Sequence, residues 1–518
     1  MKHRRLKPAI PRDNSSEDVT IMSFSVRGLP EYHKGMLVVG LQPSMGRFWP
    51  GATPGVVAAS LDSPAISAMV GLSRRGMIKR VIPLSSASPG DGLVPVLASS
   101  AATIAGSQAR YGGGGGRVAA TLGATASQKR SKDANAGVCI VELDSEGDEN
   151  RLRDELANDP DVTFAARVPV RYASVRRPRR SKVTGATPAA IPPAGDMWNL
   201  ARIGWSEARG LPGFQDAMKI KVAVLDTGID EQHPDLVGRI AGYVHSYAGV
   251  SAPSGPEDVI GHGTHVAGTI CANFDNVFGV RGIASCALLA WKIFDDEPDL
   301  LRVLLGPDEY VYYVDPVMYR RALSECLDAK VDVVNLSIGG PGEPDPQERQ
   351  LFDLLVADGV TVVAAMGNER SLGSPISYPA AIPGVIGVGA TTINDRVADF
   401  SNRGGHISIA APGVGIWSTL PTYPGQTGFV AATRPDGTSI PGAPKSRDTN
   451  YASWQGTSMA SPHVAAAAAL VLANKGKMPG HDVRTALMNS ADLVPGMGGA
   501  AFHPDYGAGR LNLAKLLS

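Results

Sequence analysis

Apolar and polar residues along the second part of the chain follow the pattern of an α/β protein. Short, predominantly apolar runs are typical of buried parallel strands, and such runs occupy residues 222–225, 287–291, 331–336, 360–365 and 385–388. Segments of helical length and pattern occupy residues 262–272, 316–330, 346–358 and 461–475. This alternation predicts a mainly parallel sheet with helices on both faces, whose ligands bind beyond the carboxyl ends of the strands.

The first part of the chain has a different pattern, in which two strand–helix–strand units follow one another. Strands are expected at residues 36–41, 77–84, 138–143 and 162–170, with a short helix at 63–69 and a longer one at 148–158. Leu152 and Leu156 lie on one face of the longer helix, because residues four apart are neighbours on a helix. The order predicts a small ferredoxin-like α+β domain ahead of the α/β domain.

Segments of biased composition mark the boundaries between these units. Residues 85–136 are rich in Ser, Ala and Gly and are expected to form a low-complexity insert within the small domain. Residues 173–195 contain Arg and Pro clusters, which are typical of an exposed linker or of a site of proteolytic release. We therefore expect a flexible tail at 1–34, the small domain at 35–172, the linker at 173–195 and the α/β domain at 196–518.

One helix carries a candidate reactive side chain. The apolar run 464–473 follows the segment 456–463 and predicts a buried helix with Pro462 in its first turn. Ser458 would then lie just before a helix N-terminus, where the dipole favours a developing oxyanion. A serine that only caps the helix is the alternative from this segment alone.

Charge, apolar stretches and cysteine content exclude several classes of protein. The 49 Lys and Arg residues balance the 49 Asp and Glu residues, which argues against a general nucleic-acid binder. No apolar stretch reaches the ~20 residues of a membrane helix, and no apolar core of a signal peptide follows the basic N-terminus. A cytoplasmic location is expected, with secretion as the alternative. The four cysteines have no paired CxxC spacing, so we expect reduced, buried thiols.

Three further polar residues complete a candidate nucleophilic site. Asp226 follows the strand at 222–225, and His262 opens a helix between two glycines. A nucleophilic serine needs an imidazole that takes its proton and a carboxylate that holds the imidazole. It also needs donors to the oxyanion, for which Asn368 is a candidate beside the backbone N–H of Ser458.

The motifs around these residues resemble those of the subtilisin-like serine proteases. The resemblance rests on Asp-Thr-Gly at 226–228, His-Gly-Thr-His-Val-Ala-Gly at 262–268, Gly-Asn at 367–368 and Gly-Thr-Ser-Met-Ala-Ser-Pro-His at 456–463. The order Asp, His, Ser along the chain is that of subtilisin itself. The similarity spans about residues 198–517 and implies a serine endopeptidase of the subtilisin-like α/β fold.

The resemblance implies a role for each of the four site residues. Ser458 would be the nucleophile, and His262 the general base that later acts as general acid. Asp226 would orient the imidazole and stabilise its charged form, and Asn368 would donate to the oxyanion.

The same resemblance implies a substrate groove. Ser337, Ile338 and Gly339 would pair with the substrate backbone as an added strand. The pocket for the residue before the scissile bond would be lined by Ala365, Met366, Gly367 and Ser377. We expect this pocket to prefer an uncharged, apolar or aromatic residue, with Glu369 shifting the preference towards basic residues. Tyr378-Pro379 resembles a cis-proline position of the family.

No cofactor is expected for the chemistry, but the resemblance implies one structural calcium site. Asp235 and Asn276 would supply side-chain oxygens, and loop carbonyls would supply the others. A turn stabilised by Asn, Asp and Gly without a metal is the alternative.

The small domain resembles the inhibitory, fold-assisting propeptide of the family. Its last residues, near 168–173, would lie in the substrate groove, so the expected partners are a polypeptide substrate and the chain's own N-terminal domain, with neither nucleic acid nor membrane. Whether the domain is cleaved off stays open. Insertions at 295–315 and 420–450 depart from the family and would either restrict access or fill surface. The alternatives to an endopeptidase are a peptide transferase or macrocyclase and a regulatory pseudo-protease.

Overall fold

The computed structural model describes most of the small domain and nearly all of the α/β domain. The described residues are 30–42, 69, 71–72, 75–84, 135–174, 197–245, 255–274, 279–299, 311–433, 435 and 439–518. Residues 1–29 of the predicted tail, most of the helix expected at 63–69, residues 85–134 of the predicted insert (85–136) and residues 175–195 of the predicted linker (173–195) lie outside these residues.

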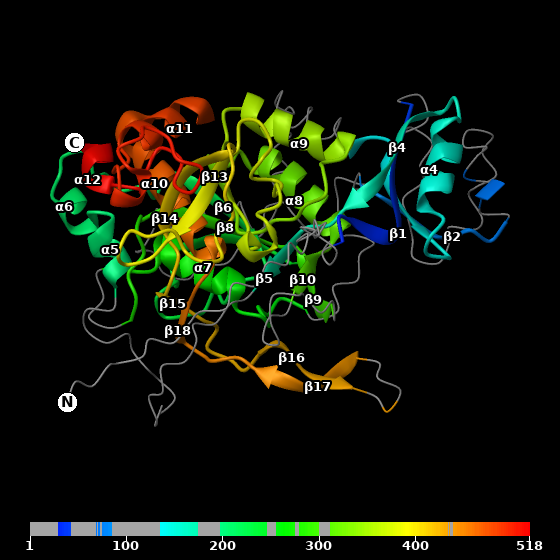
Figure 1. Cartoon of the computed structure of the whole chain (residues 1–518), viewed down its shortest axis with the longest axis horizontal. Coiled ribbons are helices and arrows are strands. Elements are labelled where there is room, and N and C mark those ends of the chain that lie inside the picture. The colour runs from blue at the N-terminus through cyan, green and yellow to red at the C-terminus, as the bar shows by residue number, and fades with distance from the viewer. Residues whose placement is uncertain are drawn as a thin grey trace, which may run out of the picture.

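A seven-stranded parallel sheet forms the centre of the larger domain (Figure 1). Its strand order is β14-β13-β12-β11-β6-β8-β7, and all neighbouring pairs are parallel. The strands are β6 (Lys221–Asp226), β7 (Ile240–Val244), β8 (Ala287–Lys292), β11 (Val333–Leu336), β12 (Thr361–Ala365), β13 (Ile386–Thr391) and β14 (Ile407–Pro412). The predicted α/β fold is confirmed, and the five strands expected from apolar runs form its central part.

The helices cover the sheet in two groups. Helix α10 (Thr457–Lys475) packs against β11 to β14 and contacts α7 (His262–Cys271). Helices α8 (Pro316–Ala329) and α9 (Pro346–Ala357) contact one another and the sheet. The remaining helices are α5 (Trp198–Arg202), α6 (Trp205–Arg209), α11 (Gly480–Asn489) and α12 (Leu513–Leu517). None of the described helices combines the length and apolarity needed to cross a membrane.

Helix α10 begins earlier than its sequence indicates. We expected a start near residue 461 with Pro462 in the first turn, but the helix starts at Thr457 and Pro462 lies inside it. A proline removes the hydrogen bond to the carbonyl four residues earlier, here that of Ser458. The Ser337 hydroxyl donates to this carbonyl at 2.9 Å, so a side chain from another element compensates for the proline.

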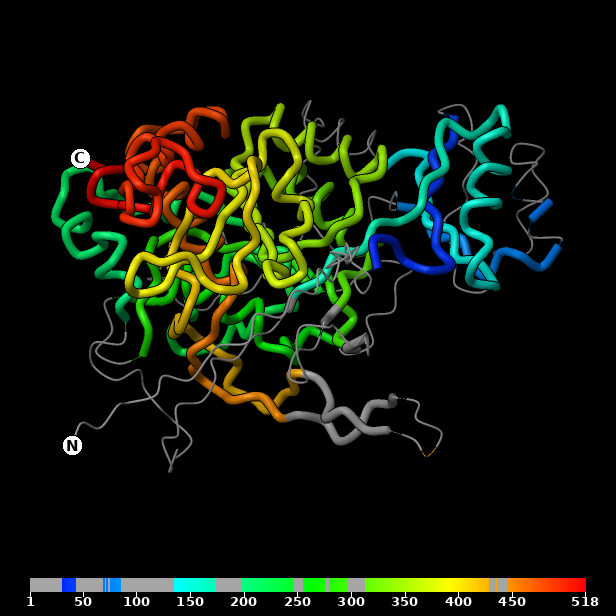
Figure 2. Tube along the Cα trace, viewed as in Figure 1, coloured from blue at the N-terminus to red at the C-terminus, as the bar shows by residue number. Residues whose placement is uncertain are grey.

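The small domain has the ferredoxin-like order that the sequence predicts. Its strands are β1 (Tyr32–Leu41), β2 (Ile78–Pro83), β3 (Val138–Leu143) and β4 (Val162–Pro169), arranged β2-β3-β1-β4 with antiparallel pairs. Helix α4 (Glu149–Ala157) buries Leu152 and Leu156 on one face of this sheet. The opposite face packs on Val317 of α8, which joins the two domains. Figure 2 shows the small domain at one end of the molecule, beside the α/β domain.

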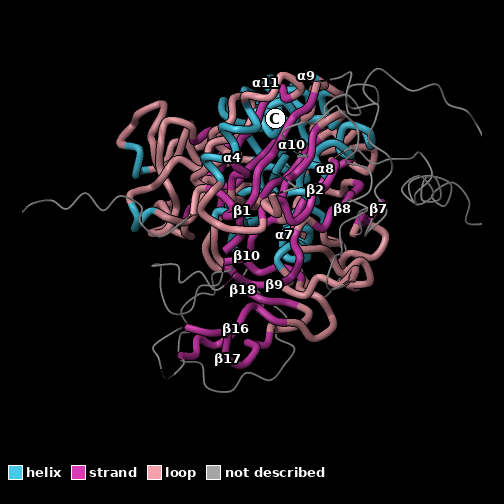
Figure 3. Tube along the Cα trace, turned by 90° about the vertical axis from the view of Figure 1, so that its right-hand side faces the viewer, coloured by secondary structure: helices cyan, strands magenta, loops and turns pink. Residues whose placement is uncertain are grey.

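Both insertions contain strands. Residues 294–314 supply β9 (Phe294–Asp299) and β10 (Val311–Val314), which form a three-stranded sheet with β5 (Tyr172–Ser174) in the order β5-β10-β9. Residues 426–446 form the hairpin β16 (Gln426–Thr433) and β17 (Ser439–Ser446), which extends away from the α/β domain (Figure 3). A further pair joins β15 (Ile416–Thr419) to β18 (Tyr451–Trp454). The four cysteines are buried and free.

Candidate active site

Asp226 and His262 are brought together by the end of β6 and the start of α7. His262 Nδ1 lies 2.7 Å from Asp226 Oδ1, and both side chains are buried. Gly263 makes this approach possible, because a Cβ at this position would lie 2.0 Å from the Gly228 carbonyl oxygen. Since a carboxylate only accepts hydrogen bonds, the imidazole carries a proton on Nδ1, and Nε2 is the nitrogen that can accept another.

The environment of His262 favours its charged form. Burial opposes protonation, but the charge of Asp226 and its hydrogen bond outweigh burial and raise the pKa of His262. Nε2 is buried and has no hydrogen-bond partner among the described residues. The imidazole is therefore positioned to take up a proton at Nε2.

Asp258 is a supporting residue that the sequence reasoning missed. Its carboxylate accepts the backbone N–H groups of Gly261 at 2.8 Å and Thr264 at 2.9 Å, together with the hydroxyls of Thr227 and Thr264. It thereby ties the first turn of α7 to the loop after β6. The only signal in the sequence is an acidic residue four positions before His262, which is typical of a helix start.

Ser458 lies in the first turn of α10, near the carboxyl end of β11. Its hydroxyl donates to the Ser337 carbonyl oxygen at 3.0 Å rather than to His262. The Ser337 hydroxyl in turn donates to the Ser458 carbonyl oxygen. In this arrangement the Ser458 hydroxyl and the His262 imidazole share no hydrogen bond.

Asn368 follows β12 and points its side chain at the start of α10. Its Oδ1 accepts the Thr457 backbone N–H at 2.9 Å and the Thr457 hydroxyl at 3.1 Å. The Thr457 hydroxyl also accepts the Gly367 N–H at 3.1 Å. With the amide oxygen engaged, Nδ2 is the donor end of the Asn368 side chain.

Ser458 and Asn368 line a small cavity, whereas Asp226 and His262 are not part of its lining. Its lining, which comes from the ends of β11 and β12, the start of α10 and strand β5, consists of Tyr172, Ser337, Ile338, Gly339, Ala365, Gly367, Asn368, Glu369, Thr457 and Ser458. Ser377 lies behind it, buried, with a hydroxyl that has no hydrogen-bond partner among the described residues. The Tyr378–Pro379 peptide bond beside it is cis.

Met366 does not line the cavity, in contrast to the pocket expected for the residue before the scissile bond. It is fully buried in the main core, and its sulfur packs towards Gly387 on β13. Side chains alternate between the two faces of a strand and its extension, so Ala365 and Gly367 reach the cavity while Met366 points into the core.

Strand β5 of the N-terminal part lies beside this cavity, where Tyr172 bridges Gly339. The Tyr172 N–H donates to the Gly339 carbonyl at 2.9 Å, and the Gly339 N–H donates to the Tyr172 carbonyl at 3.0 Å. On its other side β5 pairs antiparallel with β10. The Tyr172 hydroxyl donates a hydrogen bond to the Glu369 carboxyl group. The same carboxyl group accepts a hydrogen bond from Asn402 Nδ2 at 2.8 Å. Burial raises the pKa of Glu369 despite these donors.

Two other histidines near the site have packing roles. His265 stacks on Trp454 with ring centroids 5.0 Å apart, and burial lowers its pKa to about 3. His463 lies 2.8 Å from the Met459 carbonyl through Nδ1 and 2.9 Å from Asn199 through Nε2, and burial lowers its pKa to about 4. Both are neutral at physiological pH, which leaves His262 as the imidazole for proton transfer.

The predicted calcium residues are only partly within the described structure. Asp235 is buried, and its carboxylate accepts the Val280 N–H at 3.0 Å, as in a turn that the carboxylate stabilises. Asn276 lies outside the described residues. Within those residues no three His, Cys, Asp or Glu side chains form a group that could hold a metal ion.

Comparisons with known proteins identify the family of the α/β domain. Residues 217–509 match the Peptidase_S8 model, the subtilase family. Subtilisin of Bacillus pumilus is 35% identical over 297 residues, which cover 57% of this chain and 89% of that protein. The major intracellular serine protease of Bacillus subtilis (strain 168) is 35% identical over 272 residues, covering 51% of this chain and 70% of that protein.

The likeness extends to a solved structure. The crystal structure of fervidolysin from Fervidobacterium pennivorans, a keratinolytic enzyme related to subtilisin, matches with a TM-score of 0.58 at 24% identity. It covers 94% of this chain and 61% of that chain, and at this identity it supports the fold alone. On the family match and the sequence identities, the chain belongs to the subtilase family, the subtilisin-like serine endopeptidases.

Proposed function

We propose that the chain hydrolyses peptide bonds of extended polypeptides through an acyl-enzyme formed on Ser458. The observation that carries this proposal is the buried Asp226–His262 pair at 2.7 Å, whose Nε2 has no hydrogen-bond partner among the described residues. This pair follows strand β6, and Ser458 and Asn368 lie by the carboxyl ends of the neighbouring parallel strands β11 and β12. In the first step Ser458 Oγ bonds to the substrate carbonyl carbon while its proton passes to His262 Nε2. Asp226 stabilises the imidazolium that forms.

Oxyanion stabilisation and the later steps follow from the same groups. Asn368 Nδ2 and the Ser458 backbone N–H donate to the tetrahedral oxyanion at the positive end of α10. His262 then gives its proton to the leaving amine as the C–N bond breaks. A water molecule, deprotonated by His262, attacks the acyl-enzyme and releases the second product, which restores the Ser458 hydroxyl.

We further propose that the N-terminal domain holds the enzyme in a resting state. Two contacts support this: β5 pairs with Gly339, where a substrate strand would bind, and the Ser458 hydroxyl is bonded to the Ser337 carbonyl. Departure of β5 and rotation of the Ser458 side chain towards His262 Nε2 would assemble the reactive pair. Tyr172 in the cavity lining fits a pocket that prefers an uncharged aromatic residue.

Labelling with a fluorophosphonate probe tests the chemistry. The full chain should acquire the probe on Ser458, and Ser458→Ala should not. Asp226→Asn should label far more slowly, while the exposed control Asp353→Asn should label normally. Absence of labelling in a folded chain would reject the nucleophile and favour a pseudo-protease.

Product masses on a peptide substrate separate hydrolysis from peptide transfer. After hydrolysis the summed mass of the fragments exceeds that of the starting peptide by one water. Transfer or cyclisation instead yields a joined product that has not gained this water. Joined products alone would reject the endopeptidase proposal.

A further inference from the structure

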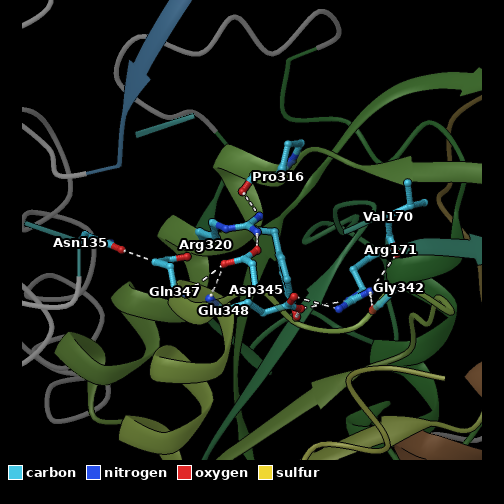
Figure 4. A network of polar contacts seen from close by, with 10 residues as sticks. Asn135, Val170, Arg171, Pro316, Arg320, Gly342, Asp345, Gln347 and Glu348 are labelled. Atoms are coloured by element: carbon cyan, nitrogen blue, oxygen red, sulfur yellow. Dashed lines mark hydrogen bonds and ion pairs between the residues drawn. The ribbon is translucent and has the colours of Figure 1, made fainter. Parts of the chain in front are cut away.

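An arginine of the groove-bound segment is held in a fully enclosed polar site of the α/β domain (Figure 4). Arg171, the residue before Tyr172, is 1% exposed, and its partner Glu348 is 0% exposed. Arg171 Nε and Nη2 donate to the two Glu348 carboxylate oxygens at 3.0 and 2.8 Å. Nη1 donates to the carbonyl oxygens of Gly342 at 2.8 Å and of Val170 at 2.9 Å. The site therefore matches the planar fork of a guanidinium.

The α/β domain itself holds Glu348 in place. Glu348 lies in the first turn of α9, where its backbone N–H donates to the capping carboxylate of Asp345 at 3.0 Å. The Tyr319 hydroxyl of α8 donates to Glu348 Oε1 at 3.2 Å. Asp345 is also ion-paired to buried Arg320 of α8, so both helices orient the capped turn. The carboxylate is thus positioned by contacts that do not involve the N-terminal segment.

The main chain around Arg171 lies where a substrate main chain would bind. A Cβ on Gly340 would lie 2.1 Å from the Val170 carbonyl oxygen, so the two backbones are in close contact. The next residue, Tyr172, forms the two-hydrogen-bond bridge to Gly339. Arg171 therefore occupies a side-chain site of the groove at a defined position, one residue before the bridge.

Emptying the groove leaves Glu348 without the cation that is hydrogen-bonded to it. Buried Arg320 still interacts electrostatically with Glu348 but is paired to Asp345, so Tyr319 is the side-chain donor left to Glu348 among the described residues. A buried carboxylate that has lost its bidentate partner is costly. Any chain that enters the groove is consequently favoured if it returns a guanidinium to this site. A lysine supplies charge without the bidentate fork, and a neutral side chain supplies neither.

We propose that Glu348, with the Gly342 carbonyl and the Tyr319 hydroxyl, is a specificity-determining site that selects substrates with arginine one residue before the residue that bridges Gly339. This inference rests on the proposed peptidase function and assigns its substrate class. The N-terminal segment would then be held by the same recognition that selects substrates.

Quenched fluorescent peptides test this selection on the full chain. One peptide carries Val-Arg-Tyr-Ala-Ser, the residues of positions 170–174, and its counterparts replace Arg with Lys, Gln or Leu. The enzyme carries Arg171→Gln, so that its own guanidinium does not compete. We expect kcat/KM for the Arg peptide to exceed that for the Gln and Leu peptides at least about 30-fold, with Lys between them.

Variants of the carboxylate assign the preference to Glu348. In the Arg171→Gln background, Glu348→Gln should bring the Arg-to-Gln ratio of kcat/KM to within about 3-fold of one, and Glu348→Asp should give an intermediate ratio. Asp353→Asn removes an exposed carboxylate from the same helix and should leave the ratio unchanged. Fluorophosphonate labelling of every variant shows that the protein is folded and its nucleophile is competent.

Each outcome decides the question. Equal rates for Arg and Gln peptides, or a ratio that survives Glu348→Gln, overturn the inference while the peptidase function stands. If Glu348→Gln does not fold, Glu348→Asp and the peptide series in the Arg171→Gln enzyme still decide it. A chain that neither labels nor cleaves any peptide overturns the proposed function and this inference with it.

Discussion

Replacing Arg171 with glutamine should release the active site of the full chain. The change removes both hydrogen bonds to Glu348 and leaves that carboxylate buried against a neutral side chain when β5 occupies the groove. Removing one partner of a buried ion pair costs about 3–5 kcal/mol. Water entry recovers part of this, so we take about 3 kcal/mol as the loss.

The free energy converts directly into an expected rate. Each 1.4 kcal/mol is a factor of ten in an equilibrium, so about 3 kcal/mol raises the ratio of open to closed groove roughly 100-fold. A probe that reacts with the open state alone labels in proportion to that population. The rate constant for fluorophosphonate labelling of the full-length species should therefore increase about 100-fold in Arg171→Gln.

The assay follows the labelled band of full-length size on a gel over time. Arg151→Gln is the matched control, because the ion pairs of Arg151 within the described residues are surface contacts with Asp148 and Glu155 of the same N-terminal domain. A labelling rate for Arg171→Gln within about 3-fold of the unchanged chain would refute the reasoning. In that case the buried ion pair does not limit access to Ser458.

Three further predictions concern the site, its pH dependence and its stability. Asn368→Ala should lower kcat about 10²–10³-fold, the range found for an oxyanion-hole donor of subtilisin, with little change in KM; an unchanged kcat would remove Asn368 from the mechanism. Asp226 raises the pKa of His262 above its ordinary value of 6.5, and a protonated imidazole cannot act as the base. We therefore expect kcat/KM to fall as the pH decreases through a value above 6.5. Asp226→Asn should move this acidic limb of the pH profile to lower pH. An acidic limb that stays in place in Asp226→Asn would assign it to another group. We also propose a structural calcium ion bound through Asp235 and Asn276. Calcium should raise the melting temperature, chelation should reverse this gain, and the Asp235→Ala protein should show no gain. Equal melting temperatures with calcium and with chelator would reject the site.

The sequence alone predicted much of the architecture, because strand and helix periodicity report burial locally. The central strands β6, β8, β11, β12 and β13 are apolar on both faces and were therefore recognisable. Strand β7 was missed since its residues are only partly buried and give no continuous apolar run. This edge strand lacks the pattern that both-face burial imposes on central strands. The other edge strand, β14, was also missed although it is fully buried, because Ser408 interrupts its apolar run.

The sequence also predicted those residues of the candidate site that directly follow a strand or begin a helix. Asp226 and His262 have these positions, and the structure brings them within 2.7 Å. Pro462 shows the limit of local rules: its position suggested a helix start, yet a hydroxyl from β11's end allows it inside α10. No local pattern records a compensating contact from another element.

Tertiary structure alone decided which residues of the N-terminal part meet the groove. Arg171 and Glu348 are 177 positions apart, and each by itself is typical of a solvated surface residue. Their burial depends on the packing of β5 between Gly339 and β10 and on the capped start of α9. A charge becomes a recognition element when folding encloses it with its partner, and that enclosure is a property of the packed domains, not of either segment.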